Sequence, residues 1–261
     1  MNLKNKLFLV TGGGSGMGQQ LVLSLLKREC KVIAVDINEA GLEDTARLSD
    51  NNPMLTHYVL NVTDKDAVNR LANEIISFNG IDGIINNAGI IQPFVRTEEI
   101  DANTAKRIFD VNFWGTLNMI QAFLPHLRTR NEAMVVNVSS MGGFLPIPGQ
   151  AIYGASKAAV KMLSESIAME IRGTNASVMT VFPGAINTNI KINSGISAAK
   201  NEDAAGKALS PETAAEMIVN AMMTNETELY VGRDSQMMGL LVRTDPSEAK
   251  NKIASMINHK F

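Results

Sequence analysis

The chain has 261 residues, of which 45% are hydrophobic and 19% are charged, and its formal net charge is -2 at pH 7. This charge gives no electrostatic reason to expect nucleic acid or a membrane surface as a partner. Its one cysteine, Cys30, and three histidines predict neither an internal disulfide nor a metal site. No apolar run approaches the ~20 residues of a membrane span. We expect a cytoplasmic protein with one domain over residues 1–261 and small molecules as partners.

The first predicted elements are a strand over residues 6–10, a glycine-rich turn over 11–18 and a helix with apolar residues from Leu21 onward. Glycines allow a tight turn, and the amides at a helix N-terminus favour a pyrophosphate. The spacing is G-x-x-x-G-x-G, because Met17 occupies the last position of the G-x-G-x-x-G version. The pattern predicts dinucleotide binding, with a purely structural turn as the alternative.

A second strand over 31–35 is followed by Asp36, whose carboxylate can accept both ribose hydroxyls of an adenosine. The same carboxylate repels a 2′-phosphate, and the neighbours Ser15 and Ile37 offer no cation to hold one. An ordinary turn aspartate is the alternative. The pattern favours NAD over NADP.

Strand patterns over 54–60 and 80–85 alternate with helical patterns over Glu39–Leu48 and Lys65–Phe78. This alternation predicts a parallel, doubly wound sheet. The amide-rich segment 86–89 follows the fourth strand, where its side chains can brace a cofactor and the neighbouring strands.

A long helix is predicted over 103–127, with Asn112 in its middle. Asparagine is a mediocre helix former. The sequence leaves two interpretations open, a surface amide or a buried amide that holds a water beside an active site.

A buried strand over 135–138 ends in Ser139 and Ser140, at the edge of the sheet where open α/β folds bind ligands. The following helix carries Tyr153 and Lys157, which share one helix face because they are four residues apart. A nearby cation favours the phenolate form of a tyrosine, so the pair can transfer protons. Taken alone, such a pair is more often a solvated helix pair.

Beyond a strand over 177–182, the chain departs from this rhythm over about 187–210, which we interpret as a lid over the site. A helix over 211–223, a last strand over Glu228–Val231 and a tail over about 234–261 complete the prediction. The tail is expected to end in a helix over 247–257.

Together, these elements resemble the short-chain dehydrogenase/reductase family from Lys6 to about Val231. The motifs that carry the resemblance are residues 11–18, residues 86–89, Asn112, Ser140, Tyr153 with Lys157, and Pro183-Gly184 followed by Thr188. The resemblance implies an α/β fold, a Rossmann-like doubly wound parallel sheet of about seven strands with helices on both faces. It also implies hydride transfer between a nicotinamide and a secondary alcohol or ketone.

The resemblance implies catalytic roles for four residues. Tyr153 would be the acid/base, Lys157 would lower its pKa and hold the nicotinamide ribose, Ser140 would bond the substrate oxygen and Asn112 would anchor a relay water. The implied cofactor-binding residues are Gly12, Ser15, Met17 and Gly18 at the pyrophosphate, Asp36 at the adenosine ribose, Asn87, Ala88 and Gly89 at the middle of the cofactor, Ile186 and Thr188 at the carboxamide, and also Ile37, Asn61, Val62, Tyr153, Lys157 and Pro183.

Two departures from the family pattern bear on binding and assembly. Asn61 stands where the family usually places an aspartate that accepts a hydrogen bond from adenine, so weaker binding at most is expected. The family's common Val-Asp-Gly-Gly ending is replaced by residues 231–234 and a longer tail. This puts a tetramer in doubt, whereas a homodimer through the helices of Asn112 and Tyr153 is still expected by resemblance.

The remaining residues bear on the class of substrate and on the alternative functions. The predicted site edge is apolar, which favours an apolar ketone or secondary alcohol unless these side chains pack against each other. They are Pro93, Phe94, Met141, Phe144, Leu145 and Pro146. The alternatives are an NADPH-linked 3-oxoacyl-thioester reductase, disfavoured by Asp36, a nucleotide-sugar epimerase or dehydratase, disfavoured by the glycine spacing, and a non-catalytic NAD-binding protein.

Overall fold

The computed structural model describes residues 1–78, 80–188, 190–196 and 208–257. Within these ranges the chain forms a seven-stranded sheet in the order β3-β2-β1-β4-β5-β6-β7, and all of its strand pairs are parallel. The strands are β1 Leu7–Thr11, β2 Lys31–Asp36, β3 Leu55–Val59, β4 Gly83–Asn86, β5 Ala133–Val138, β6 Ala176–Pro183 and β7 Glu228–Val231. The predicted doubly wound sheet is confirmed.

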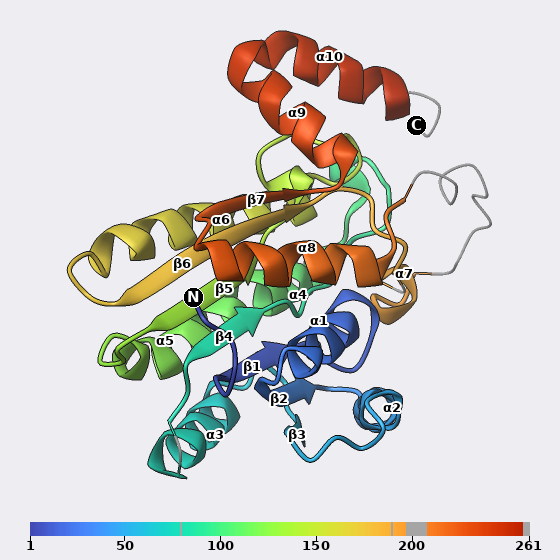
Figure 1. Ribbon diagram of the computed structural model, residues 1–261. Helices are drawn as coiled ribbons and strands as arrows, with labels where there is room; N and C mark the ends of the chain where they lie inside the picture. Colours follow the sequence, from blue (N-terminus) through green and yellow to red (C-terminus); the bar gives the residue numbers. More distant parts are fainter. Residues whose placement is uncertain (79, 189, 197–207, 258–261) are drawn as a thin grey trace.

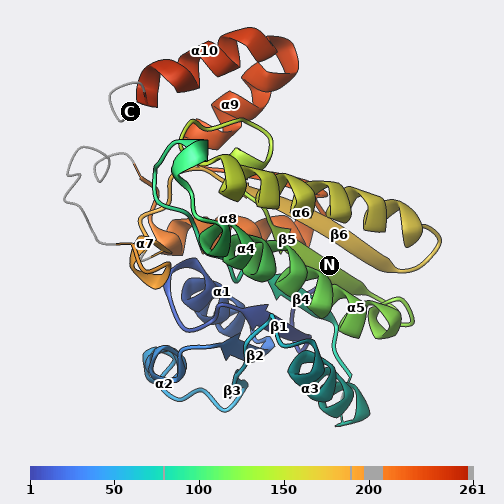
Figure 2. The same cartoon turned by 180° about the vertical axis from the view of Figure 1, so that it is seen from behind.

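Helices cover both faces of the sheet, and further helices lie at its carboxyl edge and beyond β7. They are α1 Gly16–Lys27, α2 Glu39–Leu48, α3 Lys65–Phe78, α4 Ala102–Phe109, α5 Thr116–Leu127, α6 Ala151–Glu170, α7 Ile190–Asn193, α8 Pro211–Thr224, α9 Arg233–Thr244 and α10 Pro246–Ile257. Figure 1 shows α1 and α8 in front of the sheet, and Figure 2 shows α3, α4, α5 and α6 in front when the molecule is seen from behind.

The two layers follow from the alternation of side chains along buried strands. In β1, Phe8 and Val10 belong to the core under α1 and α8, whereas Leu9 belongs to the core under α3 and α5. A parallel strand that is buried on both faces needs this continuous apolar run. Since the strand order reverses beside β1, between β1 and β4, the carboxyl ends of these strands form the crevice where such folds bind ligands.

The predicted continuous helix over 103–127 is wrong in its middle. Helix α4 ends at Phe109, the segment Asp110–Gly115 is π-helical, and α5 begins at Thr116. Asn112 lies in this wide turn and is 0% exposed, so the buried amide is the interpretation that holds. Such π-helical turns often occur at functional sites, and here the turn places an amide inside the molecule.

Helix α9 was not predicted, because only the later helix of the tail was expected. Its middle residue, Gly239, lowers helix propensity, but a Cβ there would lie 2.5 Å from the Tyr230 ring. Close packing against β7 therefore requires the glycine. In Figure 1 the α9–α10 pair lies beyond β7, and Met238 and Ile253 pack there against Leu145.

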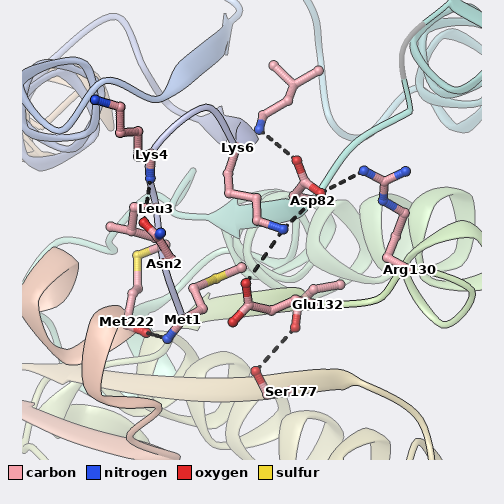
Figure 3. A network of polar contacts seen from close by, with 12 residues as sticks. Met1, Asn2, Leu3, Lys4, Lys6, Asp82, Arg130, Glu132, Ser177 and Met222 are labelled. Atoms are coloured by element: carbon pink, nitrogen blue, oxygen red, sulfur yellow. Dashed lines mark hydrogen bonds and ion pairs between the residues drawn. The ribbon is translucent and has the colours of Figure 1, made fainter.

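A network of charged side chains lies at the amino ends of β1 and β4 (Figure 3). Asp82 is 6% exposed, and its carboxylate accepts hydrogen bonds from the Leu7 backbone N–H at 2.9 Å and from Arg130 at 2.8 Å. Lys6 Nζ lies 3.6 Å from the same carboxylate. Burial alone would raise the pKa of Asp82, but the Arg130 hydrogen bond and the other partners lower it overall.

Two properties of the described ranges bear on function. None of the helices there combines the length and the hydropathy required to cross a bilayer. The same ranges hold no group of three or more His, Cys, Asp and Glu side chains suited to a metal ion.

Candidate functional site

A cavity of about 800 Å³ lies at the carboxyl edge of the sheet. It runs from the glycine turn before α1, past the ends of β2, β4 and β5, to the first turns of α6 and α7. Every residue that was predicted to be catalytic or cofactor-binding lines this cavity except Asn112, which is buried beneath Gly89. Residues far apart in the sequence thus meet around one ligand-sized space.

The glycine turn requires glycines for two separate reasons. Gly12 has φ +70°, a conformation that side chains disfavour, and a Cβ on Gly18 would lie 1.9 Å from the Gly12 carbonyl oxygen. Ser15 precedes α1, yet its side chain caps no backbone amide of the helix. The first-turn N–H groups of α1 are therefore left for an anion in the cavity.

The segment after β4 is tied to the glycine turn through Thr11. The Thr11 hydroxyl accepts hydrogen bonds from the backbone N–H groups of Asn87 and Ala88, each at 3.0 Å. The Asn87 side chain donates to the Thr11 carbonyl at 3.0 Å. These bonds hold the two halves of the crevice at a defined separation.

Asp36 ends β2 beside this turn. Its Oδ2 accepts from the Gly14 N–H and its Oδ1 from the Asn38 N–H, both at 3.0 Å. Each carboxylate oxygen can accept a further hydrogen bond, so Asp36 is held in one orientation and can still bind a ligand donor. Among the described residues lining the cavity, positive charge comes from Lys157 and Arg107, neither of which adjoins Asp36 in the sequence.

The amide oxygen of Asn61 already accepts more hydrogen bonds within the protein than expected. Its Oδ1 already accepts from the Thr63 N–H at 3.0 Å and from the Thr63 hydroxyl at 2.9 Å. Little capacity is left in that oxygen for an adenine amino group.

Ser140, Tyr153 and Lys157 meet at the end of β5. Ser140 Oγ accepts from the Gly142 N–H at 3.1 Å and is hydrogen-bonded to the Tyr153 hydroxyl. Lys157 is 4% exposed, and its Nζ donates to the Val138 carbonyl at 2.9 Å. The turn after β5 thus supplies the serine, α6 supplies the tyrosine and the lysine, and the last residue of β5 anchors the lysine.

Removal from water dominates the electrostatics of this cluster. Burial raises the pKa of Tyr153, and the hydrogen bond with Ser140 lowers it by less. Burial also lowers the pKa of Lys157 to about 8. The expected net lowering of the tyrosine pKa by the lysine is not the direction found here, because desolvation of the phenol is the larger effect.

Asn112 supports the cluster from behind. Its Oδ1 accepts from the Ile90 N–H at 2.8 Å, and its Nδ2 donates to the Ile90 carbonyl at 3.0 Å. Nδ2 also donates to Ser156 Oγ at 3.0 Å, and that hydroxyl donates to the Tyr153 carbonyl at 2.7 Å. The side chain of Asn112 therefore connects the wall after β4 to the first turns of α6.

Two buried glutamines were missed by the sequence analysis. Gln92 Oε1 accepts from the Tyr153 N–H at 2.9 Å, and Gln150 Nε2 donates to the Gln92 carbonyl at 3.0 Å. Together they join the start of α6 to the segment after β4. The available signal was the placement of each amide, one inside the apolar run 90–94 and one directly before Ala151.

The expected lid over 187–210 falls partly outside the described residues, namely at 189 and 197–207. The described part crosses the cavity. Asn193 of α7 donates to Ser15 Oγ at 2.9 Å, and Ser194 Oγ accepts from the Ile91 N–H at 2.9 Å. Arg107, also missed in the sequence, donates to the Ser194 carbonyl at 3.3 Å. This segment thus connects the glycine turn to the opposite wall.

The apolar edge divides between the cavity and the core. Phe94 and Met141 line the cavity. Phe144 packs edge-on against Phe182, with ring centroids 5.5 Å apart, and Leu145 is 1% exposed in the cluster under α9 and α10. Further apolar side chains not predicted for the edge also line the cavity, among them Ile90, Ile91, Val111, Ile147 and Ile190.

The fold and the site are those of a Rossmann-like, nucleotide-binding oxidoreductase, and comparisons with known proteins identify the family. The family model for short chain dehydrogenase matches residues 6–198. The Mycobacterium tuberculosis protein with the name oxidoreductase SadH is 29% identical over 271 aligned positions, which span 100% of this chain and 98% of the relative. The chain therefore belongs to the short-chain dehydrogenase family.

Two further similarities bear on function. The 3-oxoacyl-acyl-carrier-protein reductase FabG of Thermotoga maritima is 35% identical over 192 residues, 72% of this chain and 77% of the relative. A short chain dehydrogenase from Burkholderia cenocepacia, solved in complex with NADP, superposes with a TM-score of 0.82 at 27% identity, over 97% of this chain and 99% of that one.

Proposed function

We propose that this chain is an NAD(H)-dependent dehydrogenase that interconverts a secondary alcohol and a ketone, with a predominantly apolar substrate. The observation that carries the proposal is one continuous cavity that has the glycine turn and Asp36 at one end and the Ser140–Tyr153–Lys157 cluster at the other. Binding determinants and proton-transfer groups thus face the same space.

The residues present fit a dinucleotide. The uncapped first turn of α1 suits a pyrophosphate, the missing Cβ atoms at Gly12 and Gly18 let the backbone approach it, and Asp36 suits a ribose diol. We propose NAD over NADP because Asp36 would repel a 2′-phosphate, and because the described cationic residues that line the cavity, Arg107 and Lys157, belong to α4 and α6 and do not adjoin Asp36 in the sequence. When bound, the nicotinamide supplies or accepts the hydride.

The chain's own residues would handle the proton. In ketone reduction the Tyr153 hydroxyl donates its proton to the substrate oxygen, and in alcohol oxidation its phenolate accepts that proton. Ser140 is placed to hydrogen-bond the same oxygen. Lys157, when protonated, stabilises the phenolate. Asn112 acts as a positioning residue through Ile90 and Ser156.

A second candidate is an NADPH-linked 3-oxoacyl-thioester reductase. The similarity to FabG supports it, since the matched region includes most of the chain. The NADP bound to the Burkholderia cenocepacia relative also supports the cofactor of this alternative. Asp36 is the residue that separates the two candidates.

The test is binding of NADH and NADPH by fluorescence, followed by turnover of secondary alcohols with the preferred cofactor. We expect NADH to bind at least about tenfold more tightly. Asp36→Asn should reduce this ratio, because it removes the charge and keeps an amide oxygen for Gly14. Tighter binding of NADPH by the unaltered protein, with turnover of 3-oxoacyl thioesters, would establish the second candidate instead.

We also propose a homodimer through α5 and α6. Trp114 in the π-helical segment and Met162 and Met169 on α6 are large apolar side chains with 50%, 62% and 59% of their surface exposed. Sedimentation equilibrium should give twice the chain mass, and Met162→Glu should shift the mass toward one chain. A monomer at micromolar concentration would exclude this assembly.

A further inference from the structure

Asp234, in the first turn of α9, forms a hydrogen bond outside its own helix. Its Oδ2 accepts from the Ala185 N–H at 2.7 Å, across 49 positions of sequence. An acidic residue in the first turn of a helix generally stabilises the N-terminus of that helix. The bond to Ala185 shows that this carboxylate also holds a segment that lies after β6.

The carboxylate lies directly against the backbone of this segment. A Cβ added to Gly184 would lie 2.2 Å from Asp234 Oδ1 and 2.3 Å from Asp234 Oδ2. The φ of Gly184 is not positive, so its backbone conformation does not demand a glycine. The glycine is required because the carboxylate approaches it closely.

The segment that Asp234 holds forms one wall of the cavity. Residues 183–186 all line the cavity, whereas Asp234 is not one of the described residues that do so. The Ala185 carbonyl accepts from the Leu209 N–H at 2.9 Å, so both polar groups of the Ala185 backbone are bonded. Asp234 therefore acts on the cavity wall from behind and through Ala185.

The backbone that follows Ala185 keeps a donor for a ligand. Within the described ranges, the Ile186 N–H has no hydrogen-bond partner. In a trans peptide the C=O and the N–H point in opposite directions, so the bond from Leu209 to the Ala185 carbonyl turns the Ile186 N–H away from Leu209. The two bonds at Ala185 thus determine where this donor points.

The place of β6 in the sheet decides which part of a ligand this wall meets. Strand β6 pairs with β5, whose carboxyl end leads to Ser140, and β4 and β5 separate it from β1 and β2. Asp36 and the glycine turn follow β2 and β1. A dinucleotide with its adenosine at Asp36 therefore meets residues 183–186 with its nicotinamide half.

We propose that Asp234 is a positioning residue that fixes the cavity wall 183–186 for the nicotinamide half of the cofactor. The inference rests on the proposed function and extends it to the start of α9. It also gives a role in the site to residues 231–234, which replace the family's common ending. The carboxylate holds the backbone of Gly184 and Ala185 and does not itself contact the cofactor.

The test compares the binding of NADH and ADP-ribose by titration calorimetry. ADP-ribose keeps the adenosine and the pyrophosphate and lacks the nicotinamide. Asp234→Ala should raise the Kd for NADH about tenfold, because a hydrogen bond to a charged group no longer holds the wall. The Kd for ADP-ribose should change less than about twofold, since its binding groups lie at β1 and β2.

Further variants separate positioning from structure. Asp234→Asn keeps an oxygen that can accept from the Ala185 N–H, so it should restore most of the NADH affinity. The matched control is Ser235→Ala, because Ser235 is 0% exposed and donates from the same turn to the Phe182 carbonyl at 2.7 Å. This control should lower the thermal midpoint and leave both Kd values unchanged. Gly184→Ala displaces the same carboxylate and should repeat the selective loss, which keeps the test decisive if Asp234→Ala does not fold.

The contrary outcomes are distinct. Unchanged Kd values for both ligands in Asp234→Ala overturn the proposal. An equal loss for NADH and ADP-ribose also overturns it, because Asp234 would then have a structural role only. Both results leave the dehydrogenase function intact. If the unaltered protein binds neither NADH nor ADP-ribose, the proposed function itself is contradicted, and the inference about Asp234 with it.

Discussion

The two edges of the sheet carry buried polar networks of opposite character. At the amino edge, both oxygens of Asp82 are bonded, one to Arg130 and one to the Leu7 N–H (Figure 3). At the carboxyl edge, Asn86 donates to Asn137 at 2.8 Å, yet neither Asn86 Oδ1 nor Gln150 Oε1 has a hydrogen-bond partner within the part of the chain that the structure describes. Both carboxylate oxygens at the amino edge are thus paired within the protein. At the carboxyl edge, two buried amide oxygens have no such partner among the described residues.

The difference separates stability from function. A buried carboxylate with matched cations joins β1, β4 and the end of α5, which are distant in sequence. By contrast, Lys157 is buried with its Nζ donating to the Val138 carbonyl oxygen, and burial lowers its pKa to about 8. An ammonium that is buried against a carbonyl oxygen lowers the stability of the fold. Groups with strongly shifted pKa values cluster at functional sites. Substitutions at the two edges should therefore have separable effects.

The largest expected effect is at the carboxyl edge. Tyr153→Phe should lower kcat by about 10³-fold, because general acid/base catalysis typically contributes factors of this order. NADH affinity and the thermal midpoint should change little, since the ring is retained. Steady-state kinetics with a fluorescence titration and a melting curve measures all three. Retention of most turnover would refute the assigned role of the tyrosine.

An intermediate effect is expected at the amino edge. Asp82→Asn should lower the free energy of unfolding by about 2 kcal/mol, because it leaves Arg130 and Lys6 without their shared anion. Urea denaturation measures this loss, and kcat should be unchanged. Since the pKa of Asp82 is lowered in the folded state, its stabilisation is present above the ordinary value of 3.8 and is lost as pH falls below it. If Asp82→Asn had normal stability and a reduced kcat, the amino edge would serve function and not stability, contrary to this prediction.

The smallest effect concerns pH. The proposed ketone reduction needs a protonated Tyr153, whose pKa is raised, and a protonated Lys157, whose pKa is about 8. The value of kcat/KM for a ketone should therefore fall as pH rises through about 8, tending to tenfold per pH unit. A profile that stays flat to pH 10 would show that the lysine proton is not required.

Stability should show the opposite trend from the same group. The folded-state pKa of Lys157 lies below its ordinary value of 10.5, so between about pH 8 and pH 10.5 the unfolded chain binds more protons than the folded one. Stability contributed by this residue consequently rises with pH across that window. Lys157→Met should abolish the rise, and chemical denaturation at several pH values measures it.

Some residues of the site could be predicted from the sequence and others could not. The glycine turn, Asp36 and the Tyr153–Lys157 pair were predicted because each satisfies a local demand, such as a positive φ or an i, i+4 spacing. Gln92 was missed, because an amide gives no local sign that it will reach a backbone N–H 61 residues away. Arg107 was missed for the same reason, since its contact with Ser194 spans 87 positions.

The sequence by itself determined the alternation of strands and helices, the crevice at the carboxyl edge and most of the residues that line it. Periodicity, glycine conformation and residue chemistry act over a few residues and can be recognised locally. Tertiary structure alone decided the π-helical turn around Asn112, the close packing of α9 on Tyr230 and the unequal use of the two buried glutamine amides. These features arise from contacts between distant segments, where burial decides which polar groups are bonded within the protein.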